Sequence, residues 1–160
     1  MRMEAKLDAM GLYLPAAPAL PQGLATQFAW ARAYQGMVYL SGHAAQLADG
    51  SFAPIRGKVG AEVSFNEAQE AAKLATLLLL ASLQRLIGDL DRVGAWLSVS
   101  GMVNVAPGFA NTTGVIDGCS MLLLELFGAE AGSHARTAIG VAQLPLNSAV
   151  VIAAEVAVLS

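Results

Sequence analysis

The chain has 160 residues, of which 56% are hydrophobic and only 13% are charged, and its formal net charge is −3. This length fits one domain with a substantial core. Soluble domains usually carry about 25% charged residues, so a monomer of this composition would leave much apolar surface uncovered. The composition therefore predicts a homo-oligomer that buries sheet or helix faces between its subunits.

Charge and cysteine content argue against several classes of protein. The nine Lys and Arg residues are scattered without a basic patch, so nucleic-acid binding has no electrostatic support. The N-terminus lacks the apolar core of a signal peptide, and the most apolar run, 74–83, is too short to span a bilayer. Cys119 is the only cysteine, which excludes an internal disulfide and suits a reducing, cytoplasmic location.

The first elements expected along the chain are a lead-in and a hairpin. Residues 1–23 are punctuated by proline and indicate an irregular N-terminal lead-in. Two β-rich runs, about 27–33 and 37–42, flank a turn whose permissive position is Gly36. A minor strand is expected near Phe52.

The clearest element is a helix over about 65–87. Ser64 and Glu67 form a capping box, a device that stabilises a helix start by about 1 kcal/mol. Alanine and leucine then recur at the spacing of one helix face, and Gly88 is the expected stop.

A strand over 96–105 follows, with Gly101 as a candidate bulge. The next helix is expected over about 111–127, with Gly128 as its stop. Gly114 and Gly118 lower the helical propensity of its front half.

Two strands, about 136–142 and 149–158, complete the chain. The order β-β-(β)-α-β-α-β-β predicts one α+β domain over 24–160, with a mixed sheet and two helices packed on one of its faces. The other face of the sheet is the natural oligomer surface.

Arg136 opens a stretch that otherwise indicates buried sheet, and a guanidinium cannot lose its proton there. An unpaired buried charge is costly, so Arg136 must be paired or line a water-filled cleft. One interpretation is a clamp for a substrate carboxylate. The other is a structural salt bridge, for example to Glu155, to Glu125 or across a subunit boundary.

The remaining candidates give weaker signals. Gly42, which follows Ser41, would let a ligand approach the backbone closely. His43 and His134 titrate near neutral pH when unperturbed, but each is more often a packed or surface histidine than a general base. The sequence offers no third ligand for a metal site and no phosphate-binding loop, and Cys119 indicates a small buried side chain.

Three segments resemble the Rid family (the YjgF type, often labelled "endoribonuclease L-PSP"), and the resemblance covers about 24–158, extending to the branch with a longer N-terminus. The C-terminal segment is the most specific, because its proline follows Arg136 by nine residues. The segments are VYLSGH at 38–43, VSFNEAQEAA at 63–72 and HARTAIGVAQLPLNSAVVIAAEVAV at 134–158.

The resemblance implies a chorismate-mutase-like fold, assembled as a homotrimer around a central barrel with clefts between subunits. It also implies hydrolysis of reactive 2-enamines and 2-imines to 2-keto acids and ammonia, without a cofactor or metal. The implied partner is a small anionic metabolite, with neither nucleic acid nor membrane. By resemblance, Arg136 holds the substrate carboxylate, and Ser41, Gly42, Thr137 and Ala138 line the cleft.

Two positions depart from the family pattern. The tyrosine that lines the cleft falls on Phe28, and the glutamate that positions the attacking water falls on Val151. Glu155 lies four residues further along the same strand face, about 13 Å away at about 3.3 Å per residue, so it cannot simply replace that glutamate. The family's helix-borne asparagine aligns ambiguously near 117–120, with Ser120 as the candidate cleft residue.

Three hypotheses follow. The first is an imine or enamine deaminase with an altered substrate, and the second is a non-catalytic binding module for small carboxylates. The third, a ribonuclease, is disfavoured by the acidic balance of the chain. Whether Glu155, His43 or Asp117 reaches the cleft stays open at this point, because contacts across subunits are invisible in sequence.

Overall fold

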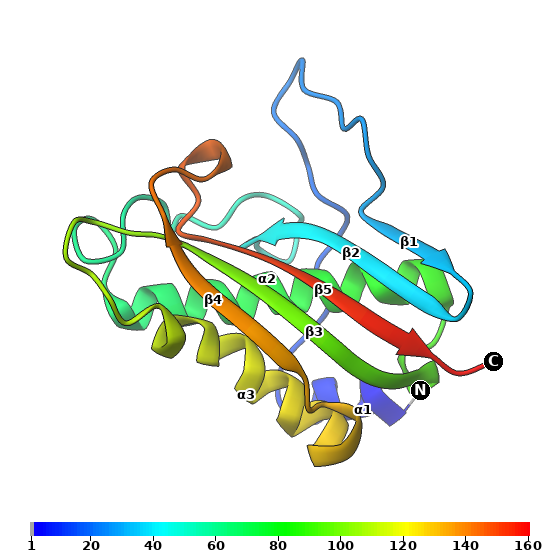
Figure 1. Ribbon diagram of the computed structural model, residues 1–160. Helices are drawn as coiled ribbons and strands as arrows, with labels where there is room; N and C mark the ends of the chain where they lie inside the picture. Colours follow the sequence, from blue (N-terminus) through cyan, green and yellow to red (C-terminus); the bar gives the residue numbers. More distant parts are fainter. Residues whose placement is uncertain (1) are drawn as a thin grey trace.

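A computed structural model of the chain describes residues 2–160 as one five-stranded sheet with helices on one side of it (Figure 1). Each element is given with its bounds: α1 Arg2–Ala9, β1 Ala31–Tyr34, β2 Met37–Ala44, α2 Phe65–Ile87, β3 Val93–Asn104, α3 Thr112–Ala131, β4 Ala135–Val141 and β5 Val150–Val158, with single 3-10 turns η1 Leu90–Arg92 and η2 Pro145–Asn147.

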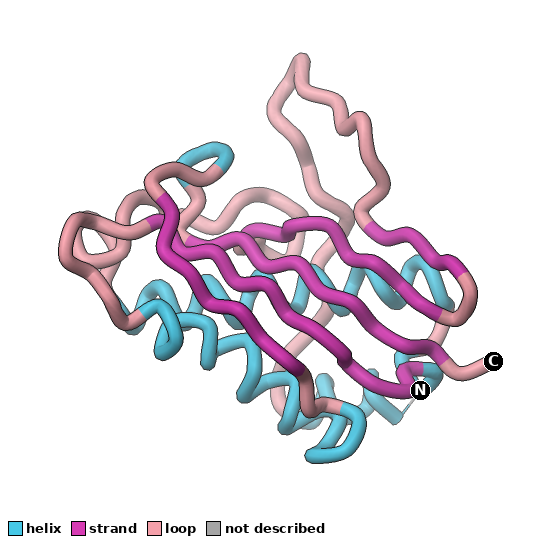
Figure 2. Tube along the Cα trace, in the orientation of Figure 1, coloured by secondary structure: helices cyan, strands magenta, loops and turns pink. Residues whose placement is uncertain are grey.

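The sheet is mixed, and its strand order is β1-β2-β5-β3-β4. β3 and β4 are parallel because α3 crosses over between them, whereas the other neighbours are antiparallel. α2 and α3 lie against the same face (Figures 1 and 2). The predicted α+β class and the placement of both helices on one face are therefore confirmed.

The core lies between this helical layer and the sheet. α2 is buried along most of its length, and its leucines and alanines meet the inward side chains of β2 and β5, while α3 packs against β3. Trp96 of β3 is the largest fully buried side chain in the described residues. The capping box of α2 is present, with the Ser64 hydroxyl accepting from the Glu67 N–H and the Glu67 carboxylate accepting from the Ser64 N–H.

Close packing explains two glycines that sequence analysis interpreted differently. A Cβ on Gly118 would lie 2.3 Å from the Gln69 carbonyl oxygen, so this glycine lets α3 approach the backbone of α2. Gly101 is not a bulge, because the register of β3 shifts between Trp96 and Ser98 instead. A Cβ on Gly101 would lie 2.6 Å from the Ile116 side chain, so its role is to admit α3 onto the sheet.

The lead-in expected to be irregular contains a short helix. α1 buries Leu7 and is held at its start by the Asp91 carboxylate, which accepts the backbone N–H groups of Arg2 and Met3 at 2.7 and 3.0 Å. The Lys6 Nζ donates to the Leu126 carbonyl of α3. These partners lie far along the chain, which is why local pattern did not indicate a helix.

The hairpin is present but begins later than expected. β1 starts at Ala31, and Gln35 and Gly36 both have positive φ, as a two-residue hairpin turn requires. The minor strand expected near Phe52 is a single bridge between Phe52 and Gln46.

α3 is the helix in the described residues that is long and apolar enough to cross a membrane by length and composition alone. Val115, Ile116, Leu123 and Leu126 are buried against α2 and the sheet, so one face of α3 belongs to the core. Met121 and Leu124 are 64% and 43% exposed on its outer face. Gly128, the expected stop, has φ 78° and interrupts the helix before its last turn.

Candidate functional site

Arg136 lies on β4 with its side chain on the helical side of the sheet, as its buried register partner Val99 indicates. Nη1 of Arg136 forms a 2.8 Å ion pair with Asp117 Oδ1 and donates to Ser120 Oγ at 3.0 Å. Nη2 donates to the Thr113 carbonyl at 3.3 Å. Within residues 2–160 the carboxylate partner of Arg136 is therefore Asp117 of α3, not Glu125 or Glu155.

The ion pair is not sealed from solvent. The Arg136 side chain is 17% exposed and that of Asp117 is 44% exposed. Among the contacts recorded for residues 2–160, three of the five guanidinium N–H groups have acceptors, which leaves Nε–H and one Nη2–H. Arg136 is thus paired and still has hydrogen-bond donors for a further anion.

His134 joins this cluster from the start of β4. Its Nδ1 lies 2.7 Å from the Gly132 carbonyl oxygen, and its Nε2 lies 2.8 Å from Ser120 Oγ. Sequence analysis gave His134 no role. The available signal was spacing: Asp117 and Ser120 are three residues apart on a helix, and His134 and Arg136 are two apart at a strand, so each pair shares a face.

Three other predicted site residues meet elsewhere. Phe28, Gly42 and Val151 line an apolar cavity of about 360 Å³ near the ends of β2 and β5. Ser41 lies beside it, with its hydroxyl donating to the Ala29 carbonyl. The other lining residues come from the 20–30 segment, the end of β2 and the loop after it, α2 and the turn before β5: Leu20, Leu24, Ala25, Thr26, Trp30, Ala44, Gln46, Phe52, Leu78, Pro145, Leu146 and Ser148.

Within one chain the two groups of predicted residues do not form one site. The cavity lies by β2 and β5, whereas Arg136 lies on β4, an edge strand that β3 separates from β5. The two residues after Arg136 point to opposite sides. Ala138 lies on the helical side, where its carbonyl accepts from the Thr112 hydroxyl, and Thr137 is exposed on the other face of the sheet.

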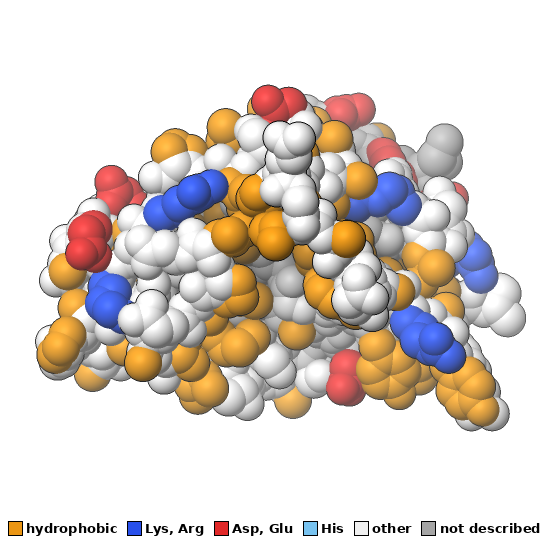
Figure 3. Space-filling view, turned by 90° about the horizontal axis from the view of Figure 1, so that it is seen from above, with side chains coloured by type: hydrophobic (Ala, Val, Ile, Leu, Met, Phe, Trp, Pro, Cys, Tyr) orange, Lys and Arg blue, Asp and Glu red, His pale blue; other side chains and the backbone are white. Residues whose placement is uncertain are grey.

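The face carrying the 20–30 segment is hollowed and rich in hydrophobic side chains. Figure 3 looks down on it from the top of Figure 1, and charged side chains lie mostly toward its edges. Gln46 lines the apolar cavity here, is 3% exposed, and its Oε1 has no hydrogen-bond partner in the described chain. The Gln46 amide oxygen is therefore an available hydrogen-bond acceptor in a mostly apolar wall.

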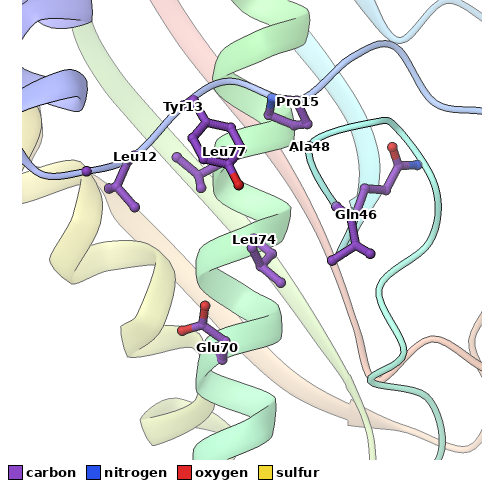
Figure 4. A pocket seen from close by; sticks show the side chains of 10 residues that line it. Leu12, Tyr13, Pro15, Gln46, Ala48, Glu70, Leu74 and Leu77 are labelled. Carbon is purple, nitrogen blue, oxygen red and sulfur yellow. The ribbon is translucent and has the colours of Figure 1, made fainter.

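A second, smaller cavity of about 200 Å³ lies between the 11–15 segment and α2. Figure 4 shows its side chains: Tyr13 and Leu12 come from the segment, Leu74, Leu77 and Glu70 come from α2, and Gln46 lies on the opposite wall. None of the predicted substrate residues lines this cavity.

His43 and Cys119 are buried and have no access to either cluster. His43 is 0% exposed; burial lowers its pKa to about 4, although its hydrogen bond to the Ser41 carbonyl opposes that shift. Its Nε2 lies 2.8 Å from Ser82 Oγ. Burial raises the pKa of the Cys119 thiol to about 11, which makes it a poor nucleophile and agrees with its interpretation as a small core side chain.

Glu4, Asp89 and Asp91 are the residues of the described chain whose ligand atoms lie close enough together to suggest a cation site, within 4.8 Å of one another. Each already has a structural partner. Gln84 donates to Glu4, the Asp91 N–H donates to Asp89, and Asp91 accepts from the start of α1. We assign these carboxylates to fastening α1.

The sequence pattern of the family described as "YjgF/chorismate mutase-like, putative endoribonuclease" matches residues 4–156. Protein TCP17 of Trypanosoma cruzi is 36% identical over 155 residues, which cover 97% of this chain and 93% of that protein.

Solved structures agree. A Shewanella oneidensis protein with the same endoribonuclease description has a TM-score of 0.88 and 30% identity, covering 98% of this chain and 99% of that one. Escherichia coli TdcF, solved with bound serine, has a TM-score of 0.59 and 18% identity over 90% of this chain and 94% of its own, and shows the fold alone.

The fold and these matches define a chorismate-mutase-like α+β protein. The chain belongs to the YjgF/Rid family. The match begins at residue 4, so it takes in most of the N-terminal segment that sequence analysis set apart from the domain.

Proposed function

We propose that this protein binds small 2-keto and 2-imino carboxylates and hydrolyses imines or enamines to the keto acid and ammonia. It would do so as a cytoplasmic homotrimer, with the carboxylate held by Arg136. The observation that carries the proposal is a partly exposed guanidinium that retains Nε–H and one Nη2–H. A charge-assisted hydrogen bond to a carboxylate contributes about 1.5–3 kcal/mol.

Asp117 sets the strength of this clamp. Its carboxylate neutralises part of the guanidinium charge at 2.8 Å and holds the side chain in one orientation. Arg136 would therefore be pre-oriented for an anionic ligand, but Asp117 would weaken the electrostatic attraction between the guanidinium and that ligand. This combination favours moderate affinity, suited to metabolites present at high concentration.

The division of the site supports assembly into an oligomer. Arg136 and the apolar cavity lie apart in one chain, so a ligand touching both needs a second subunit. A cleft between subunits, as the family resemblance implies, would join Arg136 of one chain with Phe28, Gly42 and Val151 of its neighbour.

The cavity supports an altered substrate. Phe28 and Val151 replace a hydroxyl and a carboxylate by apolar groups, and Trp30, Phe52 and Leu24 extend the same wall. Burying each additional methylene contributes about 0.8 kcal/mol. We therefore expect 2-imino acids with bulky apolar side chains to be used better than 2-iminopropionate.

The test gives the purified protein 2-iminopropionate and a larger apolar 2-imino acid, each generated in situ, and measures hydrolysis above the buffer rate. We expect activity that Arg136→Ala removes. Arg136→Lys is the matched control, because it keeps the charge but loses the planar fork, so it should retain a small fraction of the activity. A wild-type rate equal to buffer would reject the proposal.

A non-catalytic binding module is the second candidate, and the absence of the family's glutamate at Val151 favours it. This alternative predicts that a keto acid raises the melting temperature, that Arg136→Ala abolishes the shift, and that no turnover occurs. Val151→Glu would then be expected to create activity. A panel of keto acids without any shift would count against binding of either kind.

Ribonuclease activity, which the family description suggests, is disfavoured by the net charge of −3 and the scattered cations. RNA cleavage that survives stringent purification and disappears in a single-site variant would reverse this judgement.

A further inference from the structure

We propose that Ser120 and His134 form the proton-transfer pair of this protein and take over the work of the glutamate that Val151 replaces. The inference rests on the proposed imine hydrolysis and deepens it by naming the base. Adding water to an imine requires a proton acceptor, which typically raises the rate 10²–10⁴-fold. Within one chain, Arg136 has such an acceptor close by.

The hydrogen bonds of His134 fix its tautomer. A carbonyl oxygen can only accept, so the 2.7 Å contact with Gly132 places the ring hydrogen on Nδ1. In the neutral imidazole Nε2 then carries no hydrogen, and at 2.8 Å it is placed to accept the hydroxyl hydrogen of Ser120. This is the arrangement of an activated hydroxyl: a base in contact with it, and a third group that orients the base.

Arg136 acts on the same oxygen from the other side. Its Nη1 donates to Ser120 Oγ at 3.0 Å while the serine hydrogen points to His134. A cation at this distance stabilises negative charge on Oγ as its proton moves to the imidazole. Ser120 therefore connects the anchor for the substrate with the base.

The contact between Arg136 and Ser120 matters because of the structure of the substrate. In a 2-imino acid the reacting carbon is bonded directly to the carboxylate, so a carboxylate on Nε–H or Nη2–H of Arg136 places that carbon beside the same guanidinium whose Nη1 contacts Ser120. One water molecule between that carbon and Ser120 would bring its oxygen to the carbon and its hydrogen to Oγ. Arg136, Ser120 and His134 are all partly exposed, so a ligand and water can reach them.

The proton transfers balance. As the water oxygen bonds to the iminium carbon, the C=N electron pair moves to nitrogen, a water proton passes to Ser120, and the Ser120 proton passes to His134. The imidazolium then returns its proton through Ser120 to the amine nitrogen. As the C–N bond breaks, its electron pair goes to nitrogen, and the electron pair of the hydroxyl O–H bond forms the C=O bond. The hydroxyl proton passes to the departing ammonia, so keto acid and ammonium are the products.

The chain contains the same constellation a second time, in a closed form. His43 Nδ1 contacts the Ser41 carbonyl, its Nε2 lies 2.8 Å from Ser82 Oγ, and Arg85 donates to that oxygen at 3.1 Å. His43 is 0% exposed, so no substrate reaches its imidazole, whereas Ser82 is 3% exposed and lines a shallow hollow with Arg85 and Trp30. The two groups share the same hydrogen-bond geometry but differ in the exposure of the histidine. We therefore assign a structural role to buried His43, whereas His134 is accessible to a ligand.

The test compares His134→Gln and Ser120→Ala with the wild type, using 2-iminopropionate generated in situ for turnover and the product, pyruvate, for binding by calorimetry. We expect kcat to fall about 100-fold in each variant while pyruvate affinity stays within about twofold. Ser133→Ala, an exposed neighbour of His134, is the matched control and should keep wild-type kcat. Added imidazole should restore part of the rate of His134→Ala.

The outcomes are separable. A wild-type protein without hydrolysis overturns both the proposed function and this inference. A wild-type protein that is active while His134→Gln and Ser120→Ala keep its kcat overturns the inference alone. Loss of pyruvate binding together with turnover in a folded variant also overturns it, because the pair would then only support Arg136. If one variant fails to fold by circular dichroism, the other decides.

Discussion

The two histidines of this chain have the same kinds of partner and opposite surroundings. His43 is enclosed beneath β2, so its imidazole is held neutral, with a pKa lowered to about 4. His134 lies at the edge of β4, where Ser120 and Arg136 meet solvent. Burial therefore indicates a structural role for His43, whereas His134 is accessible to a substrate.

Burial of neutral His43 predicts acid sensitivity. The unfolded chain binds the proton near pH 6.5 and the folded protein only near pH 4, so stability is fully present above about pH 6.5 and falls as the pH drops toward 4. The expected loss in the free energy of unfolding is about 3 kcal/mol. Urea unfolding between pH 4.5 and 7.5 measures it.

His43→Gln is the control for this prediction. We expect it to be less stable at neutral pH, because the packing of His43 is lost, but to show a shallower slope across the same range. An identical pH slope in both proteins would mean that other groups, such as carboxylates, cause the acid sensitivity.

At the scale of elements, the approach of α3 to α2 depends on a missing side chain. A Cβ on Gly118 would lie 2.3 Å from the Gln69 carbonyl oxygen, which belongs to the backbone and cannot swing away. Overpacking of this kind costs about 1–3 kcal/mol. The helical propensity of alanine returns at most about 1 kcal/mol.

Gly118→Ala is therefore expected to lower the free energy of unfolding by about 1–2 kcal/mol. Met121→Ala, at a position 64% exposed on the same helix, should change it by less than about 0.5 kcal/mol. Denaturant unfolding of the three proteins makes the comparison. A stabilised Gly118→Ala would contradict the packing derived for this helix pair.

Elements whose own sequence carries a cap and a stop were predictable from sequence, whereas elements stabilised by residues far along the chain were not. α2 carries its own capping box and its glycine stop, and it spans the predicted 65–87. α1 depends on Asp91, which is 88 residues from Met3. Likewise Gly101 could not be distinguished from a bulge until Ile116 of α3 was seen against it.

The site was predictable in its parts but not in its assembly. Sequence pattern selected Arg136 and required a partner for it, yet several carboxylates were equally plausible, and the choice of Asp117 depends on how α3 lies on β4. Strand parity then places Arg136 and Val151 on different sides of the sheet. The division of the predicted residues into two groups is a tertiary property that no local pattern contains.

At the scale of the whole molecule, the sheet face away from the helices is uncovered in a single chain. Tyr39 and Ile139 are 47% and 48% exposed there, and Val151 and Met102 lie between them on neighbouring strands. Exposed apolar side chains on an uncovered sheet face are typical of subunit interfaces.

Light scattering coupled to size exclusion is expected to give a mass three times the 16.5 kDa of one chain. Ile139→Asp, which would bury an unpaired charge in the interface, should lower that mass, and Met121→Asp on the helical side should not. A wild-type mass of one chain would contradict the assembly and, with it, a cleft built from two subunits.

The central claim is that Arg136 holds an anion in a cleft between neighbouring subunits. A crystal structure of the protein with pyruvate tests it most directly. We predict the carboxylate within about 3 Å of Nε or Nη2 of Arg136, with side chains of an adjacent subunit around the rest of the molecule. Arg136 bound solely to Asp117, Ser120 and Thr113, with pyruvate elsewhere or absent, would contradict the account.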